Sequence, residues 1–455
     1  MAVWSIIKKG ELQRALRMDA EYYQPQYLFL DKEFSSKKLK LAEIRDVSIF
    51  VKKGIFDISP NKYIDQGVPL IRVQNIRSGF LNYNNMVFIS DNEHLKYKKT
   101  ELNEGDLVIS KVGTIGEVAI ISEKDRKCNF SQNAIGVKIN KKRIKSEYLL
   151  LYFLSNLGQL QLQRSQMFQV QSKLELEDIR DLKVVILDNL EQEELRKIVV
   201  EVVDLRESSE KIYSQAELIL LEELGLKNLD LSDDLFYTTS LREVKDNNRV
   251  DSEYYMPKYE YVSQVIKKTG YKRFDTMGKF SNNLAKRGKD LYYKYIEIGD
   301  IDVFTGDVSY TELRDCDLPA NAKLKITGRE LIVSKVRPTR GAIAIVPDYL
   351  TNNCLCSGAF SVFKIESPIR EYIQVFLRSK IGKVLLGRPS TGTQYPTITD
   401  EDVKAIPIPD LSKNVIENIS NKVFDAHAKS ESAKVLLEQA KHKVEEMIEK
   451  EAGIK

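Results

Sequence analysis

Cysteine, histidine and tryptophan are scarce in this chain, and long apolar runs are lacking. The 455 residues include four cysteines, three histidines and one tryptophan. Cys354 and Cys356 form a C-x-C pair, but Cys128 and Cys316 supply no second pair at zinc-ligand spacing, so we expect structural or incidental thiols. No run of about 18 apolar residues could span a bilayer, and the N-terminus lacks the charged-then-apolar order of a signal peptide. These absences predict a cytoplasmic protein without a membrane segment.

Catalytic motifs are lacking as well. The sequence has no G-x-G-x-x-G, no P-loop and no H-E-x-x-H pattern, and no Asn-Pro-Pro-Tyr type motif for methylating an exocyclic amine. The run D-L-V-I-S-K, which ends at Lys111, does not fit a nuclease site, because an acid and a lysine five residues apart on a strand point to opposite faces. We therefore expect no enzymatic activity, no metal and no cofactor bound by this chain.

A long internal duplication is the main feature that the sequence does contain. Residues 17–27 read R-M-D-A-E-Y-Y-Q-P-Q-Y and return at 249–259 as R-V-D-S-E-Y-Y-M-P-K-Y, with seven of eleven positions identical. D-L-V-I-S-K-V at 106–112 returns as E-L-I-V-S-K-V at 330–336, and E-Y-L-L-L-Y-F-L-S at 147–155 returns as E-Y-I-Q-V-F-L-R-S at 371–379. A period this long lies far outside the roughly 20 to 50 residues of solenoid repeats, so each copy should be a module with its own core.

Each copy has the pattern of a strand-rich domain. In the first copy, β-branched runs bounded by turn residues predict strands at 68–73, 86–89, 106–111, 117–121 and 134–139. Helical spacing begins at Ser146, and a short strand at 183–187 closes the domain. The repeated motif at 17–27 and 249–259 marks the start of each copy, and its proline and tyrosines are suited to fixing how the chain enters the domain.

Two long helices with heptad seams follow the two domains. The seams are in phase, and both contain a serine at the matching position, Ser209 and Ser430, which either sets the register or allows a close approach of two helices. Two matched heptad helices most simply pack together, but the spacing alone leaves their relative direction open. At ~1.5 Å per residue the first seam is roughly 40 Å long, near the ~34 to 36 Å between successive major-groove faces on one side of duplex DNA. The apolar seam residues are Leu195, Ile198, Val202, Leu205, Ile212, Ile219, Ile416, Ile419, Val423, Leu437 and Val444.

The basic charge is concentrated in the two domains. Residues 36–188 have 25 basic and 18 acidic side chains, and residues 267–410 have 23 and 17. Residues 189–235, by contrast, have 5 basic and 13 acidic side chains. Two basic blocks divided by an acidic one suggest two contacts with a polyanion, although a solvated surface of mixed sign is the simpler interpretation of either block alone.

The loops that differ between the copies are the candidates for base recognition. When the two copies are aligned, Lys111 corresponds to Lys335. Gly113 corresponds to Arg337, and the second loop adds Arg340. Shared lysines suit phosphate contacts, and altered arginines suit base edges such as guanine, although a solvated arginine loop would have the same pattern. The other candidate DNA-binding residues lie in polar or basic loops: Gln74, Asn75, Arg77, Lys141, Lys142, Arg143, Lys286, Arg287, Lys289, Arg388, Thr391, Thr393 and Gln394.

This order of elements resembles the DNA specificity subunit of type I restriction-modification systems. The signature, the strand-rich domain, the E-D-I/V strand region and the heptad helix occur twice, and the clearest local matches are residues 331–346 and 391–409. The first copy departs from the pattern, because it has G-T-I-G where the second has R-P-T-R-G and it lacks the Thr-Gly-Thr and both prolines of 391–409.

The resemblance implies an α+β fold with an internal pseudo-twofold repeat. The implied parts are target-recognition domains at 1–187 and 236–409 and spacer helices at 188–235 and 410–455, the helices forming an antiparallel coiled coil. Each domain would recognise one half of a bipartite, asymmetric site in double-stranded DNA. The helices would set the spacing and dock methyltransferase subunits, with restriction subunits joining the complex. S-adenosylmethionine, ATP and Mg²⁺ would belong to those partners.

Two other classes of function compete with this interpretation. A non-catalytic scaffold could use two copies of one domain to bind other proteins through the acidic rod. An enzyme such as a fused nuclease ranks third, because the chain lacks a recognisable catalytic motif.

Overall fold

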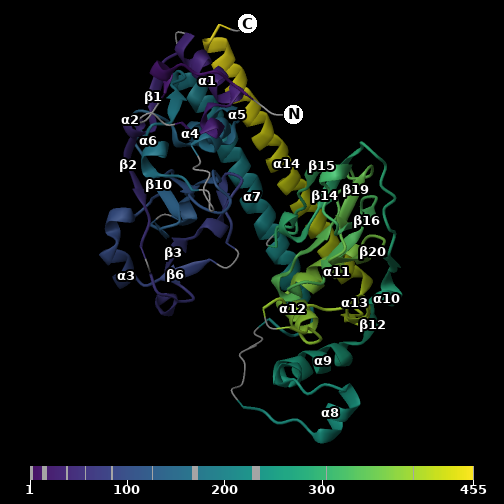
Figure 1. Cartoon of the computed structure of the whole chain (residues 1–455). Helices are drawn as coiled ribbons and strands as arrows, with labels where there is room; N and C mark the ends of the chain where they lie inside the picture. Colours follow the sequence, from purple (N-terminus) through teal and green to yellow (C-terminus); the bar gives the residue numbers. More distant parts are fainter. Residues whose placement is uncertain are drawn as a thin grey trace. The chain divides into compact units, whose positions relative to one another are not determined.

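The computed structural model forms two compact units (Figure 1). Unit 1 comprises Met1–Asp204 and Ser432–Lys455, and unit 2 comprises Leu205–Glu431. Each unit therefore combines one strand-rich region with a segment of both long helices. None of the described helices has the length and apolar character needed to cross a membrane. The structure describes residues 4–12, 18–36, 39–56, 58–83, 86–125, 127–165, 173–227, 236–303, 305–392 and 394–453.

The main sheet of unit 1 has four antiparallel strands in the order β2-β10-β7-β8. Every residue of β7 is buried, as expected for a strand that begins with three consecutive apolar residues and continues with a serine. A second sheet has the order β6-β3-β9, and the pairs β1-β11 and β4-β5 complete the unit. All six strands predicted here are present, with ends within two residues of the predicted ones. The strands are β1 (Leu41–Glu43), β2 (Ser48–Lys53), β3 (Val68–Ile71), β4 (Ile76–Arg77), β5 (Phe80–Leu81), β6 (Val87–Ile89), β7 (Leu107–Ser110), β8 (Val118–Ile120), β9 (Asn129–Phe130), β10 (Ala134–Ile139) and β11 (Lys183–Val185).

Unit 2 repeats this topology. Its main sheet has the order β13-β20-β17-β18, again antiparallel throughout, and β12 pairs with β21 as β1 pairs with β11. The second sheet has four strands, β15-β14-β19-β16, in place of three. The duplication seen in the sequence is thus a duplication of fold. The strands are β12 (Tyr271–Arg273), β13 (Lys279–Ser281), β14 (Tyr292–Ile296), β15 (Thr311–Arg314), β16 (Ala322–Ile326), β17 (Leu331–Ser334), β18 (Ile343–Ile345), β19 (Cys354–Ser357), β20 (Phe360–Lys364) and β21 (Pro407–Pro409).

The short helices also occur as matched sets, apart from α3 and α8. Each set starts with a helix that begins at the proline of the repeated motif, and it continues with a short helix after the first strand and three helices near the end of the domain. In unit 1 these helices are α1 (Pro25–Ser36), α2 (Ile44–Val47), α3 (Asp91–Lys96), α4 (Ser146–Leu154), α5 (Asn156–Arg164) and α6 (Leu176–Arg180). In unit 2 they are α8 (Leu241–Asn247), α9 (Pro257–Thr269), α10 (Phe274–Met277), α11 (Ile369–Arg378), α12 (Lys380–Gly387) and α13 (Asp400–Lys404).

The helical stretch that begins at Ser146 is broken into two helices at Ser155, which the apolar spacing did not predict. The backbone of Ser155 is extended, its N–H closes α4 on Leu151 O at 2.9 Å, and its side chain accepts a bond from the Gly158 N–H at the start of α5. A serine that ends one helix and caps the next makes the turn without leaving backbone groups unpaired. Ser379 does the same between α11 and α12.

This turn requires a glycine three residues after each serine. A Cβ on Gly158 would lie 2.1 Å from Tyr152 O, and a Cβ on Gly382 would lie 2.2 Å from Phe376 O. Both distances are below any real Cβ contact, and the obstructing atoms are backbone atoms that cannot rotate away.

A buried tyrosine ties the helices to the closing strand in both units. Tyr148 of α4 donates to Val185 O at 2.5 Å, and Tyr372 of α11 donates to Pro409 O at 2.7 Å. The two tyrosines are fully buried, and burial raises the pKa of both phenols, so both stay protonated donors at neutral pH.

The long helices α7 (Asn189–Glu223) and α14 (Lys413–Glu451) pack against each other and run antiparallel. In unit 1, Lys443 Nζ lies 2.5 Å from Glu194 Oε1. In unit 2, Ser209 Oγ donates to Ala426 O at 2.7 Å, and Lys422 Nζ donates to Gln215 at 3.0 Å. Residue numbers thus rise along α7 as they fall along α14, which answers the question of direction that the heptads left open.

The seam positions differ in burial, and the two matched serines have different roles. Leu195, Val202, Ile419, Val423 and Val444 are at most 1% exposed. Leu437 is also buried, whereas Ile198, Leu205, Ile212, Ile219 and Ile416 are partly buried. Ser209 bonds the facing helix backbone, but Ser430 donates to Asp307 of the strand-rich region of unit 2. The hydroxyl of Ser430 therefore joins α14 to the domain and not to α7.

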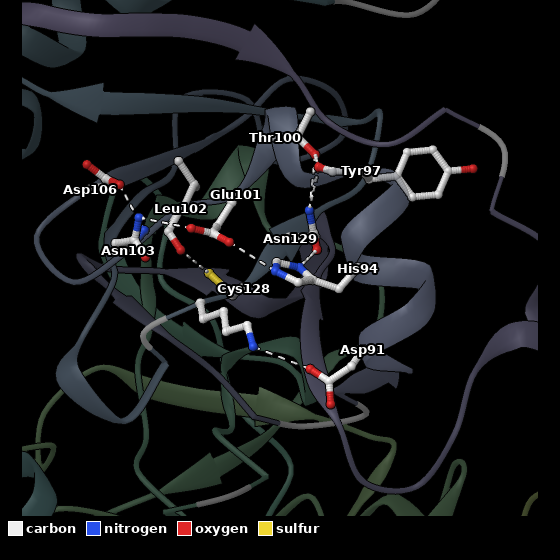
Figure 2. A network of polar contacts seen from close by, with 11 residues as sticks. Asp91, His94, Tyr97, Thr100, Glu101, Leu102, Asn103, Asp106, Cys128 and Asn129 are labelled. Atoms are coloured by element: carbon white, nitrogen blue, oxygen red, sulfur yellow. Dashed lines mark hydrogen bonds and ion pairs between the residues drawn. The ribbon is translucent and has the colours of Figure 1, made fainter.

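A polar network inside unit 1 holds α3 against β9 (Figure 2). His94 is 1% exposed, and its ring nitrogens lie 2.5 Å from Asn129 Oδ1 and 3.0 Å from Glu101 Oε2. The amide nitrogen of Asn129 donates to Tyr97 O and Thr100 Oγ1. His94 therefore has a structural role in the second sheet.

The glycine turns give a test of the packing. Gly158→Ala or Gly382→Ala should destabilise the protein by about 1–3 kcal/mol or more, because the added methyl forces the backbone apart. Thermal and denaturant unfolding of the full chain measure this change. Gly299→Ala is the control, since its Cβ would meet Glu297 Oε1 at an ordinary 3.6 Å; equal effects of all three changes would contradict the close-approach argument.

Candidate nucleic-acid interface

The predicted loops of unit 1 meet at the C-terminal end of β7. Arg77 Nη1 donates to Thr114 Oγ1 at 2.7 Å, so the Gln74–Arg77 loop touches the G-T-I-G loop. Val112 pairs with Lys173 in an isolated β-bridge, which brings a third segment to this edge. Gln74 is exposed and Arg77 is partly exposed. The structure thus brings together two loops that the sequence proposed separately.

Asn75 does not belong to this surface, and its assignment as a candidate contact needs correction. Its side chain is fully buried; Oδ1 accepts the Arg72 N–H at 3.0 Å, and Nδ2 donates to Asn82 O at 2.9 Å. The amide that looked suited to an adenine edge instead closes the turn that presents its neighbour Gln74.

Lys111 lies near two other lysines and one carboxylate, so positive charge exceeds negative charge around it. Lys53 Nζ and Lys173 Nζ both lie 3.1 Å from Glu175, and all three groups act electrostatically on Lys111. Burial lowers the pKa of the Lys111 ammonium, and the nearby Lys53 lowers it further. Burial alone would raise the pKa of the Glu175 carboxyl, but its bonds to Lys173 and Lys53 lower it. Three lysines around one carboxylate leave a net positive site of the kind that favours a phosphate.

Lys335, the counterpart of Lys111, is in a different environment. Its Nζ lies 2.9 Å from Asp400 Oδ1, and its side chain is 19% exposed. Asp400 also accepts a bond from Ser361 at 2.5 Å. The two equivalent lysines, which the sequence treated alike, therefore differ in charge balance. Lys335 is paired with Asp400, whereas the carboxylate near Lys111 is already paired with Lys53 and Lys173.

The loops of unit 2 meet at the equivalent end of β17. Val336 pairs with Thr397, and Thr397 pairs with Thr391, so the loop after β17 and the 388–396 loop form one surface. Arg337 joins them, since its N–H donates to Pro396 O at 2.7 Å. Arg340, Thr391 and Gln394 are exposed, and Thr393 lies outside the described residues.

Arg388 contacts the repeated motif instead of projecting from this loop. Its guanidinium lies 4.7 Å from the ring centroid of Tyr254, and its counterpart Arg164 lies 4.2 Å from that of Tyr22. Arg164 is also paired with Asp31 through two bonds of 2.8 Å. A contact repeated in both units indicates that Arg388 has a structural role.

The repeated motif also supports the loop directly. Arg249 donates to Pro389 O at 3.1 Å and to Ser390 O at 3.2 Å while it is paired with Asp251 at 2.7 Å. The motif that marked the start of the second copy therefore holds the base of a loop 140 residues later.

The two basic patches lie in different places. Lys141 donates to Glu104 O at 2.7 Å, just before β7, and Arg143 donates to Asp46 O at 2.6 Å. Because β10 runs antiparallel to β7, exposed residues 141–143, including Lys142, lie at the end of the sheet opposite to Lys111.

In unit 2, Arg287 donates to the carbonyls of Pro319 and Ala322, and Ala322 pairs with Ser357. Residues 286–289, with exposed Lys286 and Lys289, are therefore close to the segment that follows β19. Ala359 in that segment accepts a hydrogen bond from the Lys335 N–H.

The acids at the start of β7 and β17 are structural. Asp106 accepts the N–H groups of Asn103 and Ile139 at 2.8 and 2.9 Å, and Glu330 accepts the Thr327 N–H at 3.0 Å. Burial raises the pKa of the Asp106 carboxyl, and the two backbone bonds oppose that shift. Within the described ranges no cluster of three or more His, Cys, Asp or Glu side chains could hold a metal ion.

Comparisons with known proteins give a family match in the first copy of the duplication. The family model described as Type I restriction modification DNA specificity domain matches residues 36–218, which is less than half of the chain. The chain is 26% identical over 165 residues to the EcoBI type I restriction enzyme specificity subunit of Escherichia coli. That alignment covers 33% of this chain and 35% of the relative, so the chain spans about a third of its length.

Two solved structures are similar along most of the chain. They are the S subunit of a type I restriction-modification system from M. genitalium, with 11% identity and a TM-score of 0.35, and the HsdS subunit from Thermoanaerobacter tengcongensis, with 12% identity and a TM-score of 0.28. Each covers 91% of this chain and 96% of the other.

Neighbouring residues 74 and 75 provide a matched pair for testing this geometry. Asn75→Ala should destabilise the protein by about 1–3 kcal/mol, because it removes the acceptor of a buried backbone N–H. Gln74→Ala, at an exposed position of the same turn, should change stability by less than about 0.5 kcal/mol. Thermal unfolding measures both; a stable Asn75 variant would return that residue to the candidate contacts.

Proposed function

We propose that this chain is the sequence-specific DNA-binding specificity subunit of a type I restriction-modification complex. One observation carries the proposal: the same loop-bearing end of the same sheet occurs twice, with different polar side chains at equivalent positions. The match of residues 36–218 to a DNA specificity domain supports it.

Each unit contacts one half of a bipartite DNA site. Contacts to phosphates fix the position of a protein on the duplex without selecting a sequence, whereas contacts to base edges select it. The lysine cluster around Lys111 suits the first task, and Gln74 and Arg77 suit the second. In unit 2, Arg337, Arg340 and Gln394 occupy the base-reading position. Because the two sets differ, the two half-sites differ and the whole site is asymmetric.

The helices α7 and α14 set the spacing and bind the partner subunits. Four apolar side chains of these helices, Val200, Leu218, Phe424 and Val435, are 39 to 47% exposed. Exposed apolar residues on an otherwise charged rod favour a protein partner. The methyltransferase subunits dock there, and restriction subunits join the complex.

The chemistry belongs to these partners. This chain is non-catalytic, and S-adenosylmethionine, ATP and Mg²⁺ are bound by the other subunits. A complex that acts on bacterial chromosomal and invading DNA works in the cytoplasm.

A scaffold that binds only proteins is the alternative, and DNA binding separates the two. The full chain, co-expressed with its methyltransferase subunit if needed for solubility, is offered random-sequence duplexes and the bound fraction is sequenced. Enrichment of two short motifs at a fixed spacing supports the proposal, and binding without sequence preference contradicts it.

Salt dependence tests the role of the lysine cluster. Lys111→Ala should weaken binding to all sequences alike and reduce the slope of log K against log salt by about 0.9, the value for one lost phosphate contact. Fluorescence anisotropy at several salt concentrations measures the slope. Lys142→Ala is the control, because residues 141–143 lie at the other end of the sheet; an effect of Lys142 with none of Lys111 would place the DNA at that end instead.

The spacing role of the helices is tested by lengthening both. Seven residues inserted after Asp204 and seven after Glu431 keep the heptad phase and add ~10 Å to each helix. The preferred spacer should lengthen, by up to about three base pairs at ~3.4 Å each. Sequencing of bound duplexes gives the new spacer, and an unchanged spacer in a folded variant would show that the helices do not set it.

A further inference from the structure

The backbone at Arg337 has a conformation that an arginine rarely adopts. Its φ is 49°, in the left-handed region, where a side chain crowds the neighbouring carbonyl. The equivalent residue in unit 1 is Gly113, with φ of 75°. Both loops thus turn in the same way after the central strand, and glycine is the residue that does so without strain. An arginine is retained in unit 2 at a position where it lowers the stability of the loop, and such strain is a mark of functional sites.

The guanidinium of Arg337 lies over the face of an aromatic ring. It lies 4.4 Å from the ring centroid of Tyr395, and its Nη2 donates to Gln394 O at 3.2 Å. Tyr395 is 64% exposed, so the ring is not part of the core. Attraction between a cation and a ring face favours this position of the guanidinium over the ring.

Arg337 also lacks the partner that many other arginines of unit 2 have. No ion pair joins it to a carboxylate in the part of the chain that the structure describes. Five other arginines of the unit have a carboxylate oxygen within 2.5 to 2.8 Å: Arg249, Arg273, Arg314, Arg329 and Arg370. The charge of Arg337 is therefore oriented by the protein without being neutralised by it.

The loop that carries Tyr395 is anchored on both sides. Arg249 holds its start through Pro389 O and Ser390 O, and the Arg337 N–H holds its end through Pro396 O. The ring and the guanidinium that it supports are therefore fixed with respect to each other before any ligand arrives. A side chain ordered in advance loses less entropy on binding.

We propose that Arg337 recognises a guanine in the half-site contacted by unit 2, and that Tyr395 is the positioning residue that holds its guanidinium in place for a two-bond contact. A guanidinium edge matches O6 and N7 of guanine in the major groove. The inference rests on the proposed function and adds to it one base and a residue that the sequence analysis missed.

Three substitutions test the proposal in the full chain, with wild-type selection of bound duplexes as reference. Arg337→Gly should keep or raise the Tm, because it relieves the left-handed strain, and should reduce the preference for guanine at one position roughly 5- to 150-fold. Tyr395→Ala should reduce the preference at that same position with little change in Tm. Tyr395→Phe keeps the ring face and should restore the wild-type preference.

Arg329→Gly is the matched control. Arg329 also has a positive φ, 69°, but it is paired with Asp348 at 2.6 Å and precedes β17, at the end opposite to Arg337. This variant should show no change in base preference. If Arg329→Gly altered the same position, the effect would reflect loop strain alone and the proposal would fail.

The outcomes also separate this inference from the proposed function. A wild-type chain that selects a bipartite site while Arg337→Gly and Tyr395→Ala keep every base preference would overturn the inference and leave the proposed function standing. A wild-type chain without sequence preference would overturn both. Loss of preference at the same single guanine in both variants, with rescue by Tyr395→Phe, would establish it.

Discussion

Burial of the apolar faces of α7 and α14 is the constraint on which both units depend. In unit 2 the end of α7 contributes Ala216 and Leu220 to the core, Leu224 follows directly after this helix, and the start of α14 contributes Ile419 and Val423. These residues pack in one cluster with Tyr372, Ile373 and Phe376 of α11, the helix that covers the main sheet. In unit 2 the two helices are therefore part of the domain core as well as of the seam between themselves. A change in their register would be felt by the sheets, since close-packed interiors transmit small displacements.

The framework of the fold was predictable from local pattern, whereas the roles of several loop residues were not. Consecutive apolar residues at 107–109 and matched heptads depend only on neighbours in the sequence, and these predictions were confirmed. Other features depend on residues that the fold brings close together. They are the break at Ser155, the burial of Asn75 and the contact of Arg388 with Tyr254. Tyr395 was missed because its importance lies in the guanidinium above it, and no spacing rule connects positions 337 and 395. The three-residue apolar run can be recognised from the sequence, whereas an aromatic partner 58 positions away cannot.

Comparison of the two units shows where the duplicated fold has been kept and where it has diverged. The serine caps, the glycines that follow them and the buried tyrosine bonds are the same in both, because each satisfies backbone groups or close contacts that the shared topology creates. The ends of β7 and β17 differ: a glycine loop beside a lysine cluster in one unit, and an arginine on a tyrosine in the other. The sheet tolerates these differences because the loops lie beyond its last hydrogen-bonded pair. A change of side chain in the loops therefore leaves the packing of the core unchanged.

The division of the chain between the units has a consequence for its synthesis. Unit 2 is one continuous stretch, residues 205–431, whereas unit 1 consists of residues up to 204 and a segment that begins at 432. On the ribosome, the region made first therefore cannot complete its helix pairing until the last helix has been made. Until then the N-terminal half of α7, with buried positions such as Leu195 and Val202, lacks its α14 partner. Synthesis of unit 1 thus begins first, but unit 2 is the first to have all of its residues.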